Sequence, residues 1–155
     1  GQGGEEGRRI HPVIAALRTT ENGDVLVVDA SDGERAVAGE LFASEAQRRG
    51  LAALVVSGRT RDTATVAKLA IPVWSSGFAP NAYAATAEPV ANPVLDMGGV
   101  RVAPGDLIVG DDDGLVVGTA QEFQAALPRA REIEDRESAL QQTILGGSSL
   151  FEHFS

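Results

Sequence analysis

The chain of 155 residues contains no cysteine, two histidines and few aromatic side chains. The absence of cysteine excludes disulfide bonds, thiolate metal sites and cysteine nucleophiles. With His11 and His153 alone, a metal site built from several imidazoles is also excluded, so a bound metal would depend on oxygen ligands, which suit Mg²⁺, Ca²⁺ or Mn²⁺. The apolar runs are far shorter than the ~20 residues of a membrane span. Residues 1–9 are polar and rich in glycine, unlike a signal peptide. We therefore expect a cytoplasmic protein that makes no contact with a membrane.

Positive charge is also scarce: 13 Lys and Arg face 22 Asp and Glu, which gives a net charge of −9 and a pI near 4.6. Such a chain repels polyanions at long range, so we expect no nucleic-acid partner. A small anion could bind only where local positive groups oppose this field. Hydrophobic residues make up 43% of the sequence, enough for a core. We expect one domain over residues 1–155, with 1–7 flexible.

The first half of the sequence alternates helical and strand patterns. We expect helices at 8–17, 39–49 and 63–69, and apolar strands at 25–28, 51–56 and 71–74. Gly50 stands where a helix C-terminus favours glycine. Short connections between such elements favour parallel strands with right-handed crossovers, so this half predicts an α/β fold.

The second half has a different texture. We expect a long loop over 75–88, and then short strands with hairpin-type turns between them, which favour antiparallel pairing. Thr119 to Glu122 form a capping box that opens a C-terminal helix over 120–145, with an expected kink at Pro128. Apolar groups in the tail 148–155 suggest docking onto the body or a neighbouring subunit. The expected strands are 90–95, 100–102, 107–109 and 115–117.

Two short segments could carry chemistry. Gly39 to Phe42 would place free backbone N–H groups at a helix start, which can bind a carboxylate or phosphate. Arg61 could clamp a carboxylate with two hydrogen bonds, and Asp62 is an oxygen ligand suited to Mg²⁺. Together they could hold a 2-oxo acid, while Glu40 moves protons. The alternative is plain: an Arg-Asp pair in a loop is often a helix cap beside a solvated arginine.

The segment GELFASEAQRRGLAALVVSGRTRD, residues 39–62, resembles the core signature of the RraA-like family, which includes 4-hydroxy-4-methyl-2-oxoglutarate/4-carboxy-4-hydroxy-2-oxoadipate aldolases. The signature is a helix start of the Gly-x-Leu-Leu kind, then a glycine (here Gly50), then the pair Arg61-Asp62. Further matching segments follow in the same order over most of residues 24–117. They are Ile71-Pro72-Val73, Gly98-Gly99-Val100, Pro104-Gly105-Asp106 and Asp111 to Val117.

The resemblance implies a three-layer β-β-α swivelling fold, with a mixed sheet and antiparallel hairpins in its C-terminal half, assembled as trimers or hexamers. It also implies a lyase that releases pyruvate from a 4-hydroxy-2-oxo acid, possibly with oxaloacetate decarboxylation, and that needs a divalent cation, Mg²⁺ or Mn²⁺. Arg61 would clamp the substrate and Asp62 would bind the metal. The substrate-binding amides would be those of Gly39, Glu40, Leu41 and Phe42.

In this family an acidic residue at the position of Glu40 is implicated in arranging metal-bound water, so Glu40 and Arg61 are the expected catalytic residues. A C-terminal acidic residue of a neighbouring subunit would complete the site, with Glu137 as first candidate and Glu134 as second. The family segment that precedes residue 8 is expected to be absent here. Ser57 stands where many members have aspartate, and Phe42 replaces the usual leucine.

Other features have plainer explanations. Asp111 to Gly114 has the composition of a Ca²⁺ loop but lacks the remaining ligand spacing, so we expect a hairpin turn. His11 lies among apolar residues and is expected on a helix surface or in the core, with an interface role open. Thr60 and Asn81 could line the pocket. A second hypothesis, also from the resemblance, is a non-catalytic regulator that binds a ribonuclease, since an acidic surface suits a basic partner.

Overall fold

The computed structural model describes residues 11–84 and 92–154, and the chain divides into two units. The first unit comprises residues 1–104 and 108–116, and the second comprises 105–107 and 117–155. The expectation of one domain over 1–155 stays a prediction, and its flexible segment 1–7 lies outside the described residues.

A parallel sheet organises the first unit around a central strand, β3 (Ala53–Thr60). One edge of β3 pairs first with β1 (Val25–Asp29) and then with β2 (Ala36–Ala38). The other edge pairs with β4 (Val73–Phe78), so that all four strands run in the same direction. The first half of β3 is continuously apolar and buried, as expected for a strand covered on both faces.

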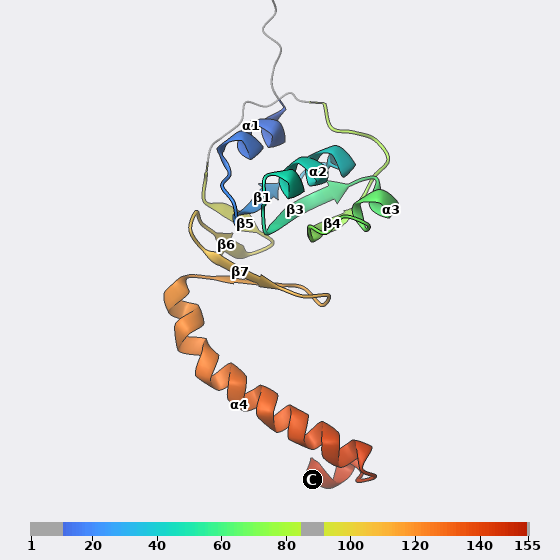
Figure 1. The fold of residues 1–155 in the computed structure, drawn as a ribbon, viewed down its shortest axis with the longest axis vertical. Coiled ribbons are helices and arrows are strands. Elements are labelled where there is room, and N and C mark those ends of the chain that lie inside the picture. Colours follow the sequence, from blue (N-terminus) through green and yellow to red (C-terminus); the bar gives the residue numbers. More distant parts are fainter. Residues whose placement is uncertain (1–10, 85–91, 155) are drawn as a thin grey trace, which may run out of the picture. The chain divides into compact units, whose positions relative to one another are not determined.

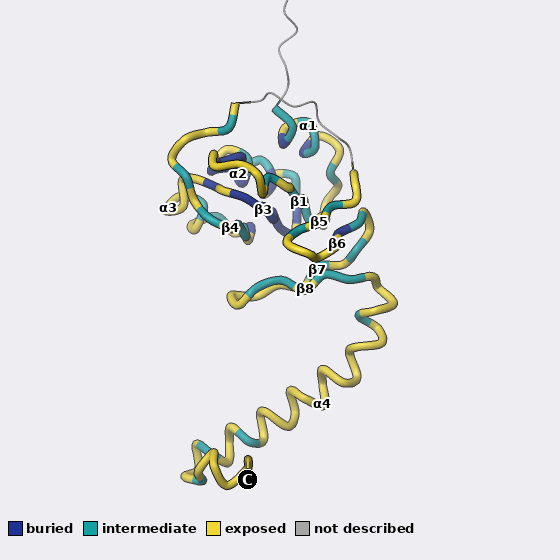
Figure 2. Tube along the Cα trace, turned by 180° about the vertical axis from the view of Figure 1, so that it is seen from behind, coloured by how far each residue is buried: buried dark blue, intermediate teal, exposed yellow. Residues whose placement is uncertain are grey.

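Two helices cover one face of this sheet, as Figure 1 shows. They are α1 (Pro12–Thr19) and α2 (Glu40–Arg48). Val13 and Leu17 of α1 pack with Ala46 of α2 in one hydrophobic cluster, while Leu54 and Val56 of β3 anchor a second. The buried segments in Figure 2 follow β3 and the sides of α1 and α2 that face it. Helix α2 therefore has a fixed position over the sheet.

The parallel strands extend beyond the predicted boundaries. The sequence indicates an end of β3 at residue 56, but Ser57 to Thr60 continue the strand because they pair with β2 and β4. The predicted loop 75–88 is likewise wrong at its start, since Ser75 to Phe78 belong to β4. Strand β2 was not predicted, because three residues beside a turn carry too little pattern. Because of these extensions, β2, β3 and β4 end at the same edge of the sheet.

Antiparallel hairpins follow, as the sequence predicts. Strands β5 (Leu95–Met97) and β6 (Val100–Val102) pair across the turn at Gly98-Gly99. Strands β7 (Leu107–Gly110) and β8 (Leu115–Gly118) form a second two-stranded sheet. The expected strand 90–95 is wrong for residues 92–94, which are not in a strand, and its first two residues lie outside the described part. The predicted α/β class with antiparallel hairpins in the C-terminal half is confirmed.

The second unit consists mainly of α4 (Ala120–Leu145) and a short 3₁₀ helix, η1 (Leu150–His153). The predicted capping box is present: Thr119 Oγ1 accepts from Glu122 N, and Glu122 Oε2 accepts from Thr119 N. The helix continues through Pro128, and the predicted kink stays a prediction. In the part of the chain that the structure describes, no helix combines the length and the hydropathy needed to cross a membrane.

Helix α3 is shorter than predicted. It spans Thr63–Val66, and residues 67–71 form turns and bends before Pro72. The short helix leaves Arg61 and Asp62 in the connection between β3 and α3.

Candidate functional site

Three parallel strands end at the same edge of the sheet, and their last residues define the candidate site. Strand β2 runs into Gly39 and the start of α2, β3 runs into Arg61 and Asp62, and β4 runs into Phe78. Because β3 lies between the other two, the Arg-Asp pair is flanked by the start of α2 on one side and by the end of β4 on the other. Ligands in open α/β sheets collect beyond such carboxyl ends.

Gly39 permits a close approach between the start of α2 and the end of β3. Its φ of −163° is extended backbone that any residue adopts, so the reason for glycine is space. A Cβ atom on Gly39 would overlap Asp62 Oδ2 and would lie 2.9 Å from Arg61 Cγ. The backbone supports the same contact, since Arg61 N donates to the carbonyl oxygen of Ala38 at 3.1 Å. The structure thus brings the two predicted segments together.

Asp62 caps the start of α2 in place of the side chain that Gly39 lacks. Its Oδ2 accepts a hydrogen bond from Glu40 N at 3.2 Å and lies 3.5 Å from Arg61 Nε. Among the described residues, the N–H groups of Leu41 and Phe42 have no acceptor. Of the four amides expected to bind substrate, that of Glu40 therefore serves Asp62. Those of Leu41 and Phe42 remain open at the helix start, where the dipole favours an anion.

Asp62 itself adopts the left-handed conformation, with φ 58° and ψ 35°. Asp tolerates this region better than most residues. Its carbonyl oxygen accepts from Thr65 N and Val66 N, both at 2.9 Å, which fixes the turn into α3. The turn directs the carboxylate back toward α2, and non-glycine residues in the left-handed region cluster at functional sites.

An open hollow of about 250 Å³ adjoins the Arg-Asp pair. Its lining comprises Thr60 to Thr63 from the end of β3 and Phe78, Ala79 and Pro80 from the end of β4. Thr60 is 5% exposed, and its hydroxyl donates to Ser75 Oγ at 3.0 Å. Thr60 thus lines the hollow, as the sequence analysis suggested, whereas Asn81 does not.

The carboxylate of Asp62 fits one kind of metal site. Among residues 11–84 and 92–154, no three His, Asp or Glu side chains gather closely enough to enclose an ion. Mg²⁺ is commonly held by one or two carboxylates, with water and substrate oxygens completing the shell. A single exposed carboxylate beside an anion-binding helix start suits that arrangement, and it does not suit a closed site built by protein ligands alone.

A second group of side chains lies behind the helix start. The ring of His11 lies 4.9 Å from that of Phe42 and 5.7 Å from that of Tyr83, and His11 Nδ1 accepts from Val13 N to cap α1. Partial burial lowers the pKa of His11 below its ordinary value. The imidazole of His11 thus packs against Phe42 and helps to hold that side chain in place. The sequence pattern does not predict this contact.

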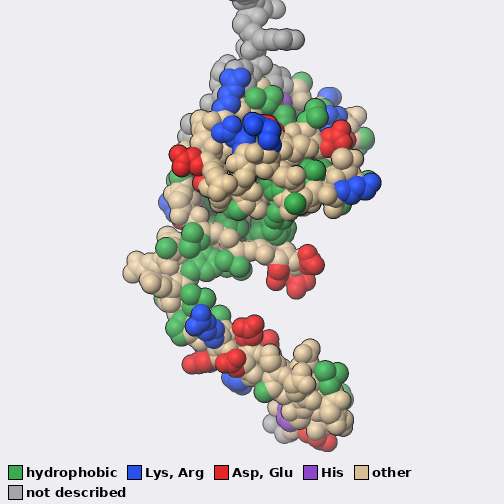
Figure 3. All heavy atoms as spheres, viewed as in Figure 1, with side chains coloured by type: hydrophobic (Ala, Val, Ile, Leu, Met, Phe, Trp, Pro, Cys, Tyr) green, Lys and Arg blue, Asp and Glu red, His purple; other side chains and the backbone are tan. Residues whose placement is uncertain are grey.

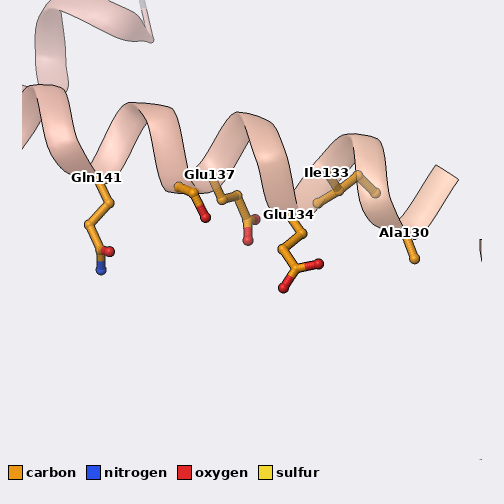
Figure 4. Close-up of a pocket in the computed structure, with 6 residues that line it drawn as sticks. Ala130, Ile133, Glu134, Glu137 and Gln141 are labelled. Atoms are coloured by element: carbon orange, nitrogen blue, oxygen red, sulfur yellow. The ribbon is translucent and has the colours of Figure 1, made fainter. Parts of the chain in front are cut away.

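The acidic candidates of the C-terminal helix belong to the second unit. Figure 4 shows Glu134 and Glu137 on one face of α4, along a shallow hollow that also includes Ile133 and Gln141. Their proposed contribution to a neighbouring subunit stays a prediction. The segment Asp111 to Gly114 is the expected hairpin turn, with Asp111 Oδ1 accepting from the backbone N–H groups of Asp113 and Gly114.

Sequence reasoning missed the apolar side of the site. Phe78, Ala79 and Pro80 were assigned to a loop, because the run Ser-Ser-Gly masks the end of β4. The register of β4 places Phe78 beside Thr60, two residues from Asp62. The apolar Val73 and Trp74 before this run were a usable signal, since a parallel strand can continue through small residues.

Comparison with known proteins defines the class. Residues 6–117 match the family described as RraA-like, Aldolase/RraA. A protein from Halalkalibacterium halodurans named "Putative 4-hydroxy-4-methyl-2-oxoglutarate aldolase" is 36% identical over 138 residues, which cover 86% of this chain and 66% of that protein. The chain belongs to the RraA-like family, and it spans slightly less than two thirds of this curated relative.

Solved structures agree with the sequence match. The chain superposes on Streptomyces coelicolor RraAS2, described as an unusual member of the RNase ES inhibitor RraA protein family, with a TM-score of 0.73 and 35% identity over 84% of this chain and 67% of that one. The RNA-processing inhibitor RraA of Thermus thermophilis gives 0.61 and 30% over 68% and 66%. The solved structures thus support both the α/β fold and the assignment to the RraA-like family.

Proposed function

We propose that this chain forms the substrate-binding part of a divalent-metal-dependent lyase that releases pyruvate from a 4-hydroxy-2-oxo acid. Oxaloacetate decarboxylation would use the same pyruvyl-binding groups. The observation that carries the proposal is the packing of Arg61 and Asp62 against Gly39 and the first turn of α2. Relatives named as 4-hydroxy-4-methyl-2-oxoglutarate aldolases support the choice of reaction class.

The substrate carboxylate is bound by two kinds of donor, backbone N–H groups and a guanidinium. The N–H groups of Leu41 and Phe42 point from the helix start, and the Arg61 guanidinium adds a charge-assisted pair of hydrogen bonds. Arg61 suits this task because its side chain is partly exposed. Its ion pair with Asp62 involves Nε, which lies 3.5 Å from Asp62 Oδ2, so the two Nη atoms can bind the substrate. Binding of the carboxylate places the 2-oxo group of the substrate beside Asp62.

Asp62 is the proposed ligand of Mg²⁺ or Mn²⁺, which when bound would polarise the 2-oxo oxygen as a Lewis acid. In the cleavage itself, the 4-hydroxyl group loses its proton and the C3–C4 bond breaks. The C4 fragment leaves as a carbonyl compound, and C3 takes up a proton to give pyruvate. Glu40, at the first position of α2, is the proposed carrier of one of these protons.

Assembly remains part of the proposal. We propose a homotrimer or hexamer in which Glu137, or Glu134, of one subunit completes the site of another. Both lie on an exposed face of α4. Substitution of Glu137 by Gln is expected to lower pyruvate release with little change in the unfolding temperature, because the Glu137 side chain is exposed and forms no ion pair with the residues that the structure describes.

The decisive assay measures pyruvate release with Mg²⁺ or Mn²⁺, with and without EDTA. EDTA should abolish turnover, and Arg61→Ala should lower kcat/KM by about 10²-fold or more, since it removes the carboxylate clamp. Asp62→Asn should remove the response to added metal while keeping a side chain that tolerates the left-handed backbone. Turnover that needs no metal and ignores both substitutions would refute the proposal.

A second candidate function has its own support. One solved structure that resembles this chain is described as a member of the RNase ES inhibitor RraA protein family, and another as the RNA-processing inhibitor RraA. The first unit also exposes Val94, Val100, Val109 and Val116, and Figure 3 shows hydrophobic side chains on its surface. A non-catalytic regulator that binds a ribonuclease would use such a surface. Inhibition of a purified ribonuclease by the chain, with no pyruvate from any 2-oxo acid, would favour this function.

A further inference from the structure

The last residue of β3 has a hydroxyl group whose proton is already used. Thr60 lines the hollow beside Asp62, and its Oγ1 donates to Ser75 Oγ at 3.0 Å. Ser75 Oγ in turn donates to the carbonyl oxygen of Gly77 at 3.3 Å. Because a carbonyl oxygen can only accept and each hydroxyl has one proton, the direction of both hydrogen bonds is fixed. Thr60 therefore gives its proton to Ser75 and has none for a ligand in the hollow.

What Thr60 can offer a ligand is an acceptor. Its hydroxyl oxygen has two lone pairs, and among residues 11–84 and 92–154 no group donates to it. The position of this oxygen is well defined, because Thr60 is 5% exposed and its carbonyl oxygen accepts from Ala79 N at 3.0 Å. A preorganised acceptor thus lies at the hollow, two residues from Asp62.

Such an acceptor matches one group of the proposed substrate. At neutral pH the carboxylate and the 2-oxo group of a 4-hydroxy-2-oxo acid can only accept hydrogen bonds, so the C4 hydroxyl group is its donor. Resting on the proposed function, we infer that Thr60 Oγ1 accepts a hydrogen bond from the C4 hydroxyl group. Ser75 is the positioning residue that keeps Thr60 in the accepting role. With the carboxylate on Arg61 and the 2-oxo group beside Asp62, C4 extends into the hollow that Thr60 lines.

The hydrogen bond distinguishes the substrate from related acids and from the product. A 2-oxo acid without the C4 hydroxyl group leaves the Thr60 acceptor unpaired, which is the kind of contact that rejects such analogues. In the cleavage, the hydroxyl proton leaves to a base and C4 becomes a carbonyl carbon. The electron pair of the C3–C4 bond stays on C3, which takes up a proton to give pyruvate. The new carbonyl oxygen has no proton for Thr60, so the hydrogen bond is lost and release of the fragment is favoured.

The test compares two reactions that both give pyruvate. 4-Hydroxy-2-oxoglutarate has the C4 hydroxyl group and gives pyruvate and glyoxylate, whereas oxaloacetate lacks it and gives pyruvate and carbon dioxide. Thr60→Val should raise KM for the hydroxy acid by about fivefold to tenfold, the scale of one hydrogen bond, without lowering kcat. KM for oxaloacetate should not rise. Thr60→Ser keeps a hydroxyl group and should restore the KM of the unaltered protein.

Ser75→Ala should have the opposite effect on oxaloacetate. It removes the acceptor of the Thr60 proton, so that the Thr60 hydroxyl can turn and donate to a ligand. The C4 carboxylate of oxaloacetate can accept this bond, and its KM should fall by about twofold or more. KM for the hydroxy acid should change little, because the Thr60 oxygen can still accept.

Two exposed residues provide matched controls. Thr65→Val makes the same chemical change in α3, and Ser76→Ala makes it beside Ser75 in β4. Both should leave all KM values unchanged. Competitive inhibition by 2-oxoglutarate, which differs from the hydroxy acid by the hydroxyl group alone, adds a readout of binding. Its inhibition constant should not rise in Thr60→Val.

The outcomes separate the inference from the proposed function. An equal rise in KM for both substrates in Thr60→Val, or no rise for the hydroxy acid, overturns the inference while pyruvate release stands. If Thr60→Val does not fold, Ser75→Ala decides, and an unchanged KM for oxaloacetate overturns the inference. Absence of pyruvate from both substrates in the unaltered protein, with no binding of pyruvate to it by calorimetry, overturns the proposed function and the inference with it.

Discussion

At the scale of single residues, Gly39 carries the contact on which the site depends. Gly39→Ala should displace Arg61 and Asp62, because the new Cβ would overlap Asp62 Oδ2 in a backbone conformation that alanine itself accepts. We expect a loss of about 1–3 kcal/mol in the free energy of unfolding, typical of overpacking, and a larger loss of 2-oxo acid binding. Denaturant unfolding and calorimetry measure the two effects.

Gly77→Ala provides the matched comparison. The added Cβ would lie 4.0 Å from Arg59 Cγ, which is ordinary contact, so both stability and ligand binding should change little. Equal effects of the two substitutions would contradict a specific role for the space at Gly39.

His11 predicts how stability varies with pH. Burial lowers the pKa of His11 in the folded chain below 6.5, while the unfolded chain keeps the ordinary value. Below pH 6.5 the unfolded state therefore binds more protons, and stability falls as the pH falls toward the lowered pKa; above pH 6.5 the contribution is fully present. Unfolding curves between pH 5 and 8 should show this slope.

His11→Asn keeps a side chain that can cap α1 but cannot titrate, so it should flatten the slope. His153→Asn changes the other histidine, which is exposed in η1, and should leave it intact. A slope that survives in His11→Asn and disappears in His153→Asn would reverse the assignment.

At the scale of elements, the capping box predicts how α4 frays. Thr119→Ala removes the hydroxyl that accepts from Glu122 N and donates to Glu122 Oε2, while the backbone N–H of residue 119 still faces that carboxylate. We expect α4 to lose about 1 kcal/mol of local stability. Hydrogen exchange of the full chain should show faster exchange in the first turn of α4. Thr143→Ala removes a hydroxyl that bonds only to Ala139 O within the same helix and should have a smaller effect on that turn.

The elements also show what the sequence could predict. The apolar run of β3 and the capping box of α4 both match the structure, because each is a local pattern with a local cause. The ends of β3 and β4 were misplaced, because Ser57 to Thr60 and Ser75 to Phe78 become strands through pairing with neighbours. A polar segment gains that stabilisation only once the sheet exists, so single-sequence pattern cannot reveal it.

At the scale of the whole molecule, the net charge of −9 opposes the binding of any anion. The local donors of the start of α2 and Arg61 act against this field, and screening it should help them. We expect the association rate of pyruvate to rise between low salt and about 0.15 M salt, where the Debye length shortens to about 8 Å. Stopped-flow binding measures the rate, and a fall with salt would contradict a repulsive overall field.

The candidate site was predictable only in part at this scale. Gly39 and the Arg-Asp pair stand out in the sequence because they match the family signature in the right order, although an Arg-Asp pair alone is often a helix cap. Phe78 and Pro80 do not, since their place depends on how far β4 extends beside β3. The interaction of Asp62 with Glu40 N was also unforeseen, because it depends on the left-handed turn after β3.

The central claim is that the start of α2, Arg61 and Asp62 form one binding site for a 2-oxo acid. Its most direct test is a crystal structure of the protein soaked with pyruvate and Mg²⁺. The account predicts the pyruvate carboxylate on Arg61 and the N–H groups of Leu41 and Phe42, with the cation on Asp62. Pyruvate bound elsewhere, with Asp62 still capping α2 and no cation near it, would contradict the account.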